Sequence, residues 1–333
     1  MKKSKLKING NLIVLFVALI LVIVGFTILN KNFLTVKNLT NILTAASLTG
    51  LVAIGHTFLI IEGQNDLCPG SLVAFLGVFS ALLSSKGFGF GVTLLITVLI
   101  GIIVGYCNSL MVNKLHLEAF IATLVTQSVM RGFAYIICDG KSIGITDPTF
   151  IWVGKTSFLG LKLSVWLMII AFIIGGVVLA KTRFGRSVYA IGGNAQAARL
   201  AGLNPQRIVT ISFVLMGFLC SLGGIVYVAR MQSGQPTANL NLEFDAITAV
   251  ILGGVSFTGG VGNMLGTVIG VLLIQSFNIG LTMNLANATF WQYVGKGGLL
   301  LVALTADYIR KVNNEKRLLA ESKRSRNNDD VKA

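Results

Sequence analysis

Apolar runs long enough to cross a lipid bilayer as helices dominate this chain. A helix needs about 20 apolar residues to cross the hydrocarbon layer, and ten segments meet or approach that length. They cover approximately residues 11–29, 42–61, 71–84, 89–112, 118–138, 162–180, 208–229, 245–258, 264–283 and 290–309. Of the 333 residues, 54% are hydrophobic and only 12% are charged, about half the charged share of a soluble domain. We therefore predict an all-α polytopic membrane protein with about ten transmembrane helices, the third and eighth being short enough for half-helices.

The basic residues predict how these helices are oriented. With the N-terminus placed in the cytoplasm, 18 of the 27 lysines and arginines fall on the inner side and seven on the outer side. Cytoplasmic loops are enriched in Lys and Arg, so we expect both termini in the cytoplasm. The net charge of +15 is spread over short segments beside apolar runs, which favours contact with membrane lipids over nucleic acid.

The sequence predicts one transmembrane domain at residues 1–309 and a charged cytoplasmic tail without fixed structure at 310–333. The first apolar run is too long for a signal-peptide core and has no small-residue cleavage site after it, so we expect it to stay as a span. Four scattered cysteines and two histidines show no metal-ligand spacing, so no metal site is predicted.

Two tripeptides resemble the end of a phosphate-binding loop, at residues 140–142 and 154–156. Neither has the leading glycine of that motif, and neither lies between a soluble strand and a helix. No catalytic motif is present either. We expect a non-enzymatic chain that binds no cofactor, so that any ATP and Mg²⁺ must be held by another subunit.

The polar, basic segment 181–207 carries its own short helix between two apolar runs. Asn194 can cap the N-terminus of a helix at 195–201, Gly202 can take the left-handed position after it, and Pro205 prevents continuation. One interpretation is a helix that docks into a groove of a cytoplasmic partner. The other is an ordinary capped loop helix.

Polar residues interrupt the apolar pattern in two places. Segment 62–71 holds two carboxylates, two amides and a proline, so it forms either a cytoplasmic turn or a polar break that lines a cavity. In the span 118–138, four residues recur at helical spacing on one face: Phe120, Thr123, Gln127 and Arg131. An arginine near the bilayer centre costs about 2.5–3.5 kcal/mol, so this face either lines a polar pathway or lets Arg131 pair with a carboxylate such as Glu62 or Asp66.

Glycines gather between residues 253 and 270. Small residues let helix backbones approach closely in lipid, and glycine-rich interruptions also permit broken helices that face protein or a water-filled cavity. Close packing is the simpler interpretation of each glycine taken alone.

Four stretches in order, residues 52–74, 118–135, 185–208 and 244–270, resemble permease subunits of bacterial ABC importers for ribose, xylose and related simple sugars, including autoinducer-2 permeases. The resemblance implies a ten-span, B12-importer-like (type II) permease in the bacterial inner membrane. It also implies a second permease subunit, in a homo- or heterodimer, a cytoplasmic ATPase and an external solute-binding protein.

The resemblance assigns a coupling helix at about 194–202, with the ATPase-coupling residues Gly193, Asn194, Ala197, Ala198, Ala201 and Gly202. Together with the polar pattern it places these residues on the substrate pathway: Asn65, Asp66, Phe120, Thr123, Gln127 and Arg131. The expected function is ATP-driven import of a simple sugar or similar small polar solute. The alternative is an ion-coupled carrier, which would need buried ion-handling carboxylates.

One departure from the family pattern falls on the predicted pathway. Gln64 and Asn65 stand where the family commonly has Gly-Ile. The family continues with Asp-Leu-Ser-Val-Gly-Ser, whereas this chain has Asp-Leu-Cys-Pro-Gly-Ser at residues 66–71, with Pro69 at the fourth place. Proline removes a backbone donor and restricts its neighbour. We therefore expect a solute preference that can differ from ribose.

Overall fold

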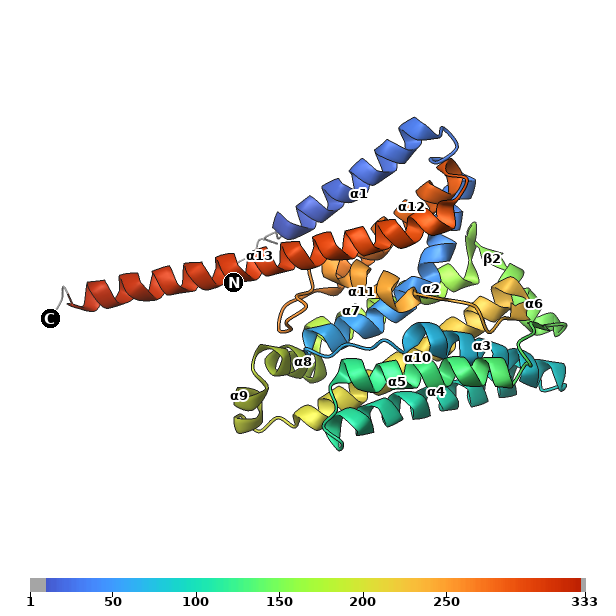
Figure 1. Cartoon of the computed structure of the whole chain (residues 1–333), viewed down its shortest axis with the longest axis horizontal. Helices are drawn as coiled ribbons and strands as arrows, with labels where there is room; N and C mark the ends of the chain where they lie inside the picture. The colour runs from blue at the N-terminus through green and yellow to red at the C-terminus, as the bar shows by residue number, and fades with distance from the viewer. Residues whose placement is uncertain (1–9, 331–333) are drawn as a thin grey trace.

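The computed structural model describes residues 10–330, which are almost entirely helical (Figure 1). The helices are α1 (Gly10–Leu29), α2 (Val36–Ile61), α3 (Pro69–Ser85), α4 (Phe90–Asn113), α5 (Ala119–Ile136), α6 (Pro148–Lys155), α7 (Leu163–Lys181), α8 (Arg183–Gly193), α9 (Ala195–Leu200), α10 (Pro205–Met231), α11 (Leu242–Leu252), α12 (Met264–Asn284) and α13 (Ala288–Asp330). Two short antiparallel pairs join β1 (Ile143–Gly144) to β4 (Ser233–Gly234) and β2 (Ser157–Phe158) to β3 (Leu161–Lys162).

Most predicted spans are confirmed as helices, with ends that differ by a few residues. Within residues 10–330, seven helices are long and apolar enough to cross a membrane: α1, α2, α4, α5, α7, α10 and α12. Helix α3 is shorter and apolar, and α11 has only 11 residues. At about 1.5 Å per residue, α11 reaches roughly half of a hydrocarbon core of about 30 Å. The predicted span 245–258 is therefore half a helix followed by a loop.

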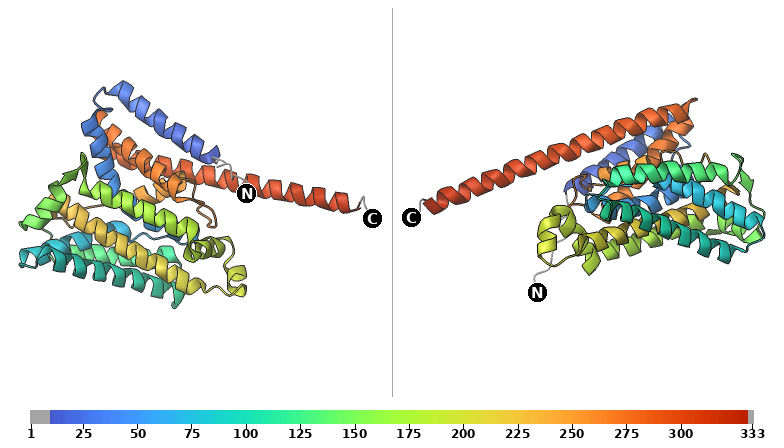
Figure 2. Two further views of the ribbon diagram at one scale, coloured as in Figure 1. Left: turned by 180° about the vertical axis from the view of Figure 1, so that it is seen from behind. Right: turned by 60° about the horizontal axis from the view of Figure 1, so that its bottom comes forward.

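The expectation of an unstructured tail is wrong within the described residues. Helix α13 continues to Asp330 and projects beyond the bundle (Figures 1 and 2). Between residues 299 and 330 the chain has no glycine or proline and is rich in Leu, Ala, Glu, Lys and Arg, which are good helix formers. The four lysines among residues 1–9, which we predict on the cytoplasmic side, and residues 331–333 lie outside the described residues.

Helix α2 is the core of the bundle. Its side chains are buried without interruption from Ala46 to Ile61, and it packs against α7, α10, α11 and α12. Nearby, α4 crosses α10 at closely approaching glycines, where a Cβ on Gly101 would overlap the Gly217 carbonyl oxygen. In lipid, such close backbone approach is a main source of helix association.

Two breaks in the helices meet at one end of α2. The first break, residues 62–68, joins α2 to α3, and the second break, residues 253–263, joins α11 to α12. The Gly260 N–H donates to the Ile61 carbonyl oxygen at 2.8 Å. In the first break Asp66 and Leu67 are buried, so this segment passes inside the bundle rather than turning at its surface.

Candidate functional site

Helix α5 presents its predicted polar face to two cavities. Asn65 and Phe120 line a cavity of about 430 Å³ near the start of the helix. Gln127 and Arg131 line another, of about 290 Å³, which we call the α5 pocket. Its remaining lining residues are Ser71, Ser128, Leu240, Asn241 and Glu243.

Thr123 and Asp66 lie buried between these cavities and line neither of them. The Thr123 hydroxyl donates to the Ala119 carbonyl at 2.7 Å and accepts from the Leu67 N–H at 3.0 Å. Asp66 accepts from the Cys68 N–H at 2.8 Å. These bonds satisfy the backbone of the first break inside the bundle, as an irregular segment at membrane depth requires.

Arg131 does not pair with a carboxylate. Its guanidinium donates to the carbonyl oxygens of Pro236 at 2.6 Å and Ala238 at 2.8 Å, and to the Ser71 hydroxyl at 3.2 Å. Glu62 lies elsewhere and accepts from the Ser212 hydroxyl at 2.6 Å. The suggested ion pair of Arg131 with Glu62 or Asp66 is therefore wrong. The Arg131 guanidinium instead donates to backbone carbonyl oxygens.

Glu243 is a site residue that the sequence analysis missed. It is 2% exposed, its Oε1 accepts from the Gln127 side-chain amide at 3.0 Å, and its Oε2 has no hydrogen-bond partner. The available signal was the pair of acidic residues, Glu243 and Asp245, at the start of an otherwise apolar segment. A carboxylate within a membrane domain marks a functional site by default.

The predicted short helix forms at α9. Asn194 caps it by accepting the Ala197 N–H at 2.9 Å, and Gly202 follows with φ +85°. Helix α10 then begins at Pro205. Every residue of the segment 193–202 except Ala198 is exposed: Gly193, Asn194, Ala195, Gln196, Ala197, Arg199, Leu200, Ala201 and Gly202.

Leu200 is 90% exposed, whereas Ala198 is buried against the chain itself. The exposed surface of α9 thus offers a leucine beside small residues and beside the polar Gln196 and Arg199, and Ala198 packs the helix against the rest of the chain.

Helix α8 connects α9 to the end of α2 and to the second break. The Tyr189 hydroxyl donates to the Gly262 carbonyl at 2.8 Å, and burial raises the pKa of this hydroxyl, which keeps it protonated. A Cβ on Gly192 would overlap the Ile61 carbonyl oxygen and come within 2.6 Å of the Gly260 nitrogen. The helix next to α9 therefore contacts the end of α2 and the second break directly.

Comparison with known proteins identifies the family of this chain. Residues 38–304 match the family described as the permease component of a branched-chain amino acid transport system. The chain belongs to this family of transport permeases. No solved structure matches it significantly.

Several relatives of this permease are named as sugar importers. It is 37% identical over 296 residues to the ribose import permease protein of Haemophilus influenzae, covering 88% of this chain and 91% of that protein. It is 38% identical over 294 residues to the ribose import permease protein of Bacillus subtilis, covering 88% and 91%. The L-arabinose ABC transporter permease protein of Azospirillum brasilense is 37% identical over 289 residues, covering 86% and 84%. The permease is thus a multi-pass inner-membrane transporter subunit and not an enzyme.

Proposed function

We propose that this permease forms the translocation path of an ATP-driven importer of a simple sugar or similar small polar solute. Two permease subunits, identical or different, would pair in a type II, B12-importer-like arrangement of about ten spans each. A cytoplasmic ATPase would hold ATP and Mg²⁺, and an external binding protein would deliver the solute. Residues 1–309 would be the membrane domain, with both termini and the segment from 310 in the cytoplasm.

The observation that carries this proposal is the outward face of α9. An exposed leucine on a capped helix with small neighbours can insert into an apolar groove of another protein. Because α8 packs on the end of α2 and on the second break, motion of α9 would move both of them beside the cavity that Asn65 and Phe120 line. The names of the relatives support import of a sugar, and the comparisons give no support to an ion-coupled carrier.

Substitution on α9 tests the proposal. Leu200→Asp and Ala197→Glu each place a charge on the docking face, and desolvating an unpaired charge in an apolar groove is unfavourable. We expect both variants to lose co-purification of the cognate ABC ATPase and ATP-dependent pentose uptake, while the permease itself remains folded.

Leu159→Asp is the matched control, because Leu159 is an exposed leucine (77%) at the other end of the bundle. It should keep both activities. Normal ATPase binding by Leu200→Asp and Ala197→Glu together would contradict the proposal.

A further inference from the structure

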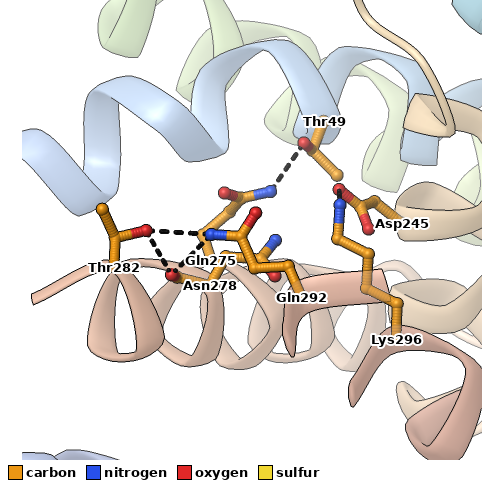
Figure 3. Close-up of polar contacts among 7 residues, drawn as sticks. All are labelled: Thr49, Asp245, Gln275, Asn278, Thr282, Gln292 and Lys296. Atoms are coloured by element: carbon orange, nitrogen blue, oxygen red, sulfur yellow. Dashed lines mark hydrogen bonds and ion pairs between the residues drawn. The ribbon is translucent and has the colours of Figure 1, made fainter. Parts of the chain in front are cut away.

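A third cavity, also lined by polar side chains, lies among α2, α11, α12 and α13, and the polar face of α5 does not reach it. It has a volume of about 310 Å³, at the lower end of the range of roughly 300–1,000 Å³ for small-molecule sites. We call it the solute pocket. Figure 3 shows the polar side chains that gather there, namely Thr49, Asp245, Gln275, Asn278, Thr282, Gln292 and Lys296.

These side chains come from four helices, and hydrogen bonds between them hold them in place. Lys296 on α13 contacts Asp245 on α11 at 2.8 Å, the one ion pair found among residues 10–330. Gln275 on α12 donates to the Thr49 hydroxyl on α2 at 2.8 Å. Gln292 on α13 donates to the Asn278 carbonyl oxygen at 3.0 Å and to the Thr282 hydroxyl at 2.9 Å. The pocket is therefore built before any ligand enters.

The pocket also contains buried polar atoms that lack partners. The side-chain oxygen of Asn278, a residue 8% exposed, accepts no hydrogen bond. Neither does Oδ1 of Asp245, a residue 7% exposed, and the side-chain nitrogen of Asn239 donates none. Leaving a buried polar group unpaired costs about 1–3 kcal/mol. A ligand that both donates and accepts would satisfy all three atoms.

The charges select among such ligands. Lys296 neutralises Asp245, and Arg230, which donates to the Thr44 carbonyl at 3.2 Å, adds a second positive charge at the lining. No uncompensated negative charge remains to hold a metal cation. Hydroxyl groups, which are neutral and act as both donors and acceptors, fit the free atoms best.

The solute pocket adjoins the α5 pocket. Leu240, which is 56% exposed, lines both cavities. Glu243 and Asp245 share the first turn of α11, and one lines each cavity. We propose that the solute pocket binds a small, neutral, polyhydroxylated molecule beside the α5 pocket, with Leu240 between the two. This inference rests on the proposed function, since it gives the importer a second solute site.

A cysteine-protection experiment on the full-length permease in lipid nanodiscs tests the inference. Ile279 lines the pocket and is half-buried, so Ile279→Cys serves as the reporter. Cys107→Ser removes the exposed native thiol, and the other cysteines within residues 10–330 are buried. The rate of modification by a methanethiosulfonate reagent is measured with D-ribose, L-arabinose, D-xylose or glycerol, and with sodium chloride at equal osmolarity.

At least one of the four polyols should slow modification by about fivefold, the value for roughly four-fifths occupancy. The slowing should disappear in Gln275→Leu and in Asn278→Leu. It should persist in Gln206→Leu, the matched amide-to-leucine change at an exposed position of α10 that lines neither pocket.

Three outcomes would overturn the inference: no slowing by any polyol, slowing that persists in both pocket variants, or slowing by sodium chloride alone. Co-purification of the ATPase is measured on the same samples. Loss of ATPase binding with intact protection would refute the proposed function and leave the pocket standing. Intact ATPase binding without protection would refute the pocket alone.

Discussion

At the scale of single residues, two side chains that line the α5 pocket already donate hydrogen bonds within the protein. Arg131 binds two carbonyl oxygens in the segment before α11, and Gln127 binds the carboxylate of Glu243 at the start of α11. Hydrogen bonds that involve a charged group contribute about 1.5–3 kcal/mol. These two side chains therefore tie α5 to the beginning of α11 and shape the wall of the pocket.

We expect Gln127→Leu and Arg131→Met to impair pentose uptake while ATPase docking through α9 stays normal. Each variant leaves acceptors unpaired in the α5 pocket, and neither residue touches α8 or α9. Uptake kinetics and ATPase co-purification, measured on the same membranes, separate the two effects. Arg131→Lys keeps the charge without the planar fork and should recover part of the uptake. Unchanged uptake in both Gln127→Leu and Arg131→Met would remove these residues from the path.

At the scale of elements, the fit of α8 against the ends of α2 and of the second break is set by backbone contact. Gly192 and Gly193 are adjacent in sequence, but their surroundings differ. A Cβ on Gly192 would overlap the Ile61 carbonyl, whereas a Cβ on Gly193 would meet nothing within 4 Å. The missing side chain at Gly192 therefore lets α8 pack directly against the backbone at the end of α2 and in the second break.

We therefore predict that Gly192→Ala destabilises the permease and that Gly193→Ala does not. Forcing an extra methyl group into a packed site typically costs about 1–3 kcal/mol. The thermal melting temperature of the purified permease, without its ATPase, measures this difference. Equal melting temperatures for the two variants would mean that α8 is free to shift away from Ile61.

At the scale of the whole molecule, the bundle has two distinct ends. Helices α8 and α9 lie at one end, and the β2–β3 hairpin lies at the other (Figure 1). The excess of Lys and Arg on the predicted inner side predicts that the end with α9 faces the cytoplasm. This assignment is a requirement of the proposed docking to an ATPase.

Cysteine labelling in intact cells tests the orientation. In the Cys107→Ser background, a membrane-impermeant thiol reagent should label Leu159→Cys from outside. It should label Leu200→Cys only after permeabilisation, because α9 would face the cytoplasm. Both positions are strongly exposed, so accessibility within the protein does not limit the reaction. Labelling of Leu200→Cys in intact cells would reverse the orientation and exclude the docking role of α9.

The sequence alone predicted what depends on local pattern. Apolar runs of bilayer length predicted the helices, and the cap at Asn194 with the left-handed Gly202 predicted α9 to within a residue. The helical spacing along α5 predicted one polar face, but its members have different contacts. Thr123 accepts a hydrogen bond from the backbone of the first break, whereas Gln127 lines the α5 pocket.

Only the tertiary structure decided which distant residues meet. It placed Glu243 against Gln127, Gly260 on Ile61, and Lys296 against Asp245 across 51 positions of sequence. Such pairings depend on how helices cross, and periodicity along one helix carries no information about the neighbour it faces. Composition pointed to both breaks, but their meeting at the end of α2 and the position of the solute pocket were beyond the reach of the sequence pattern.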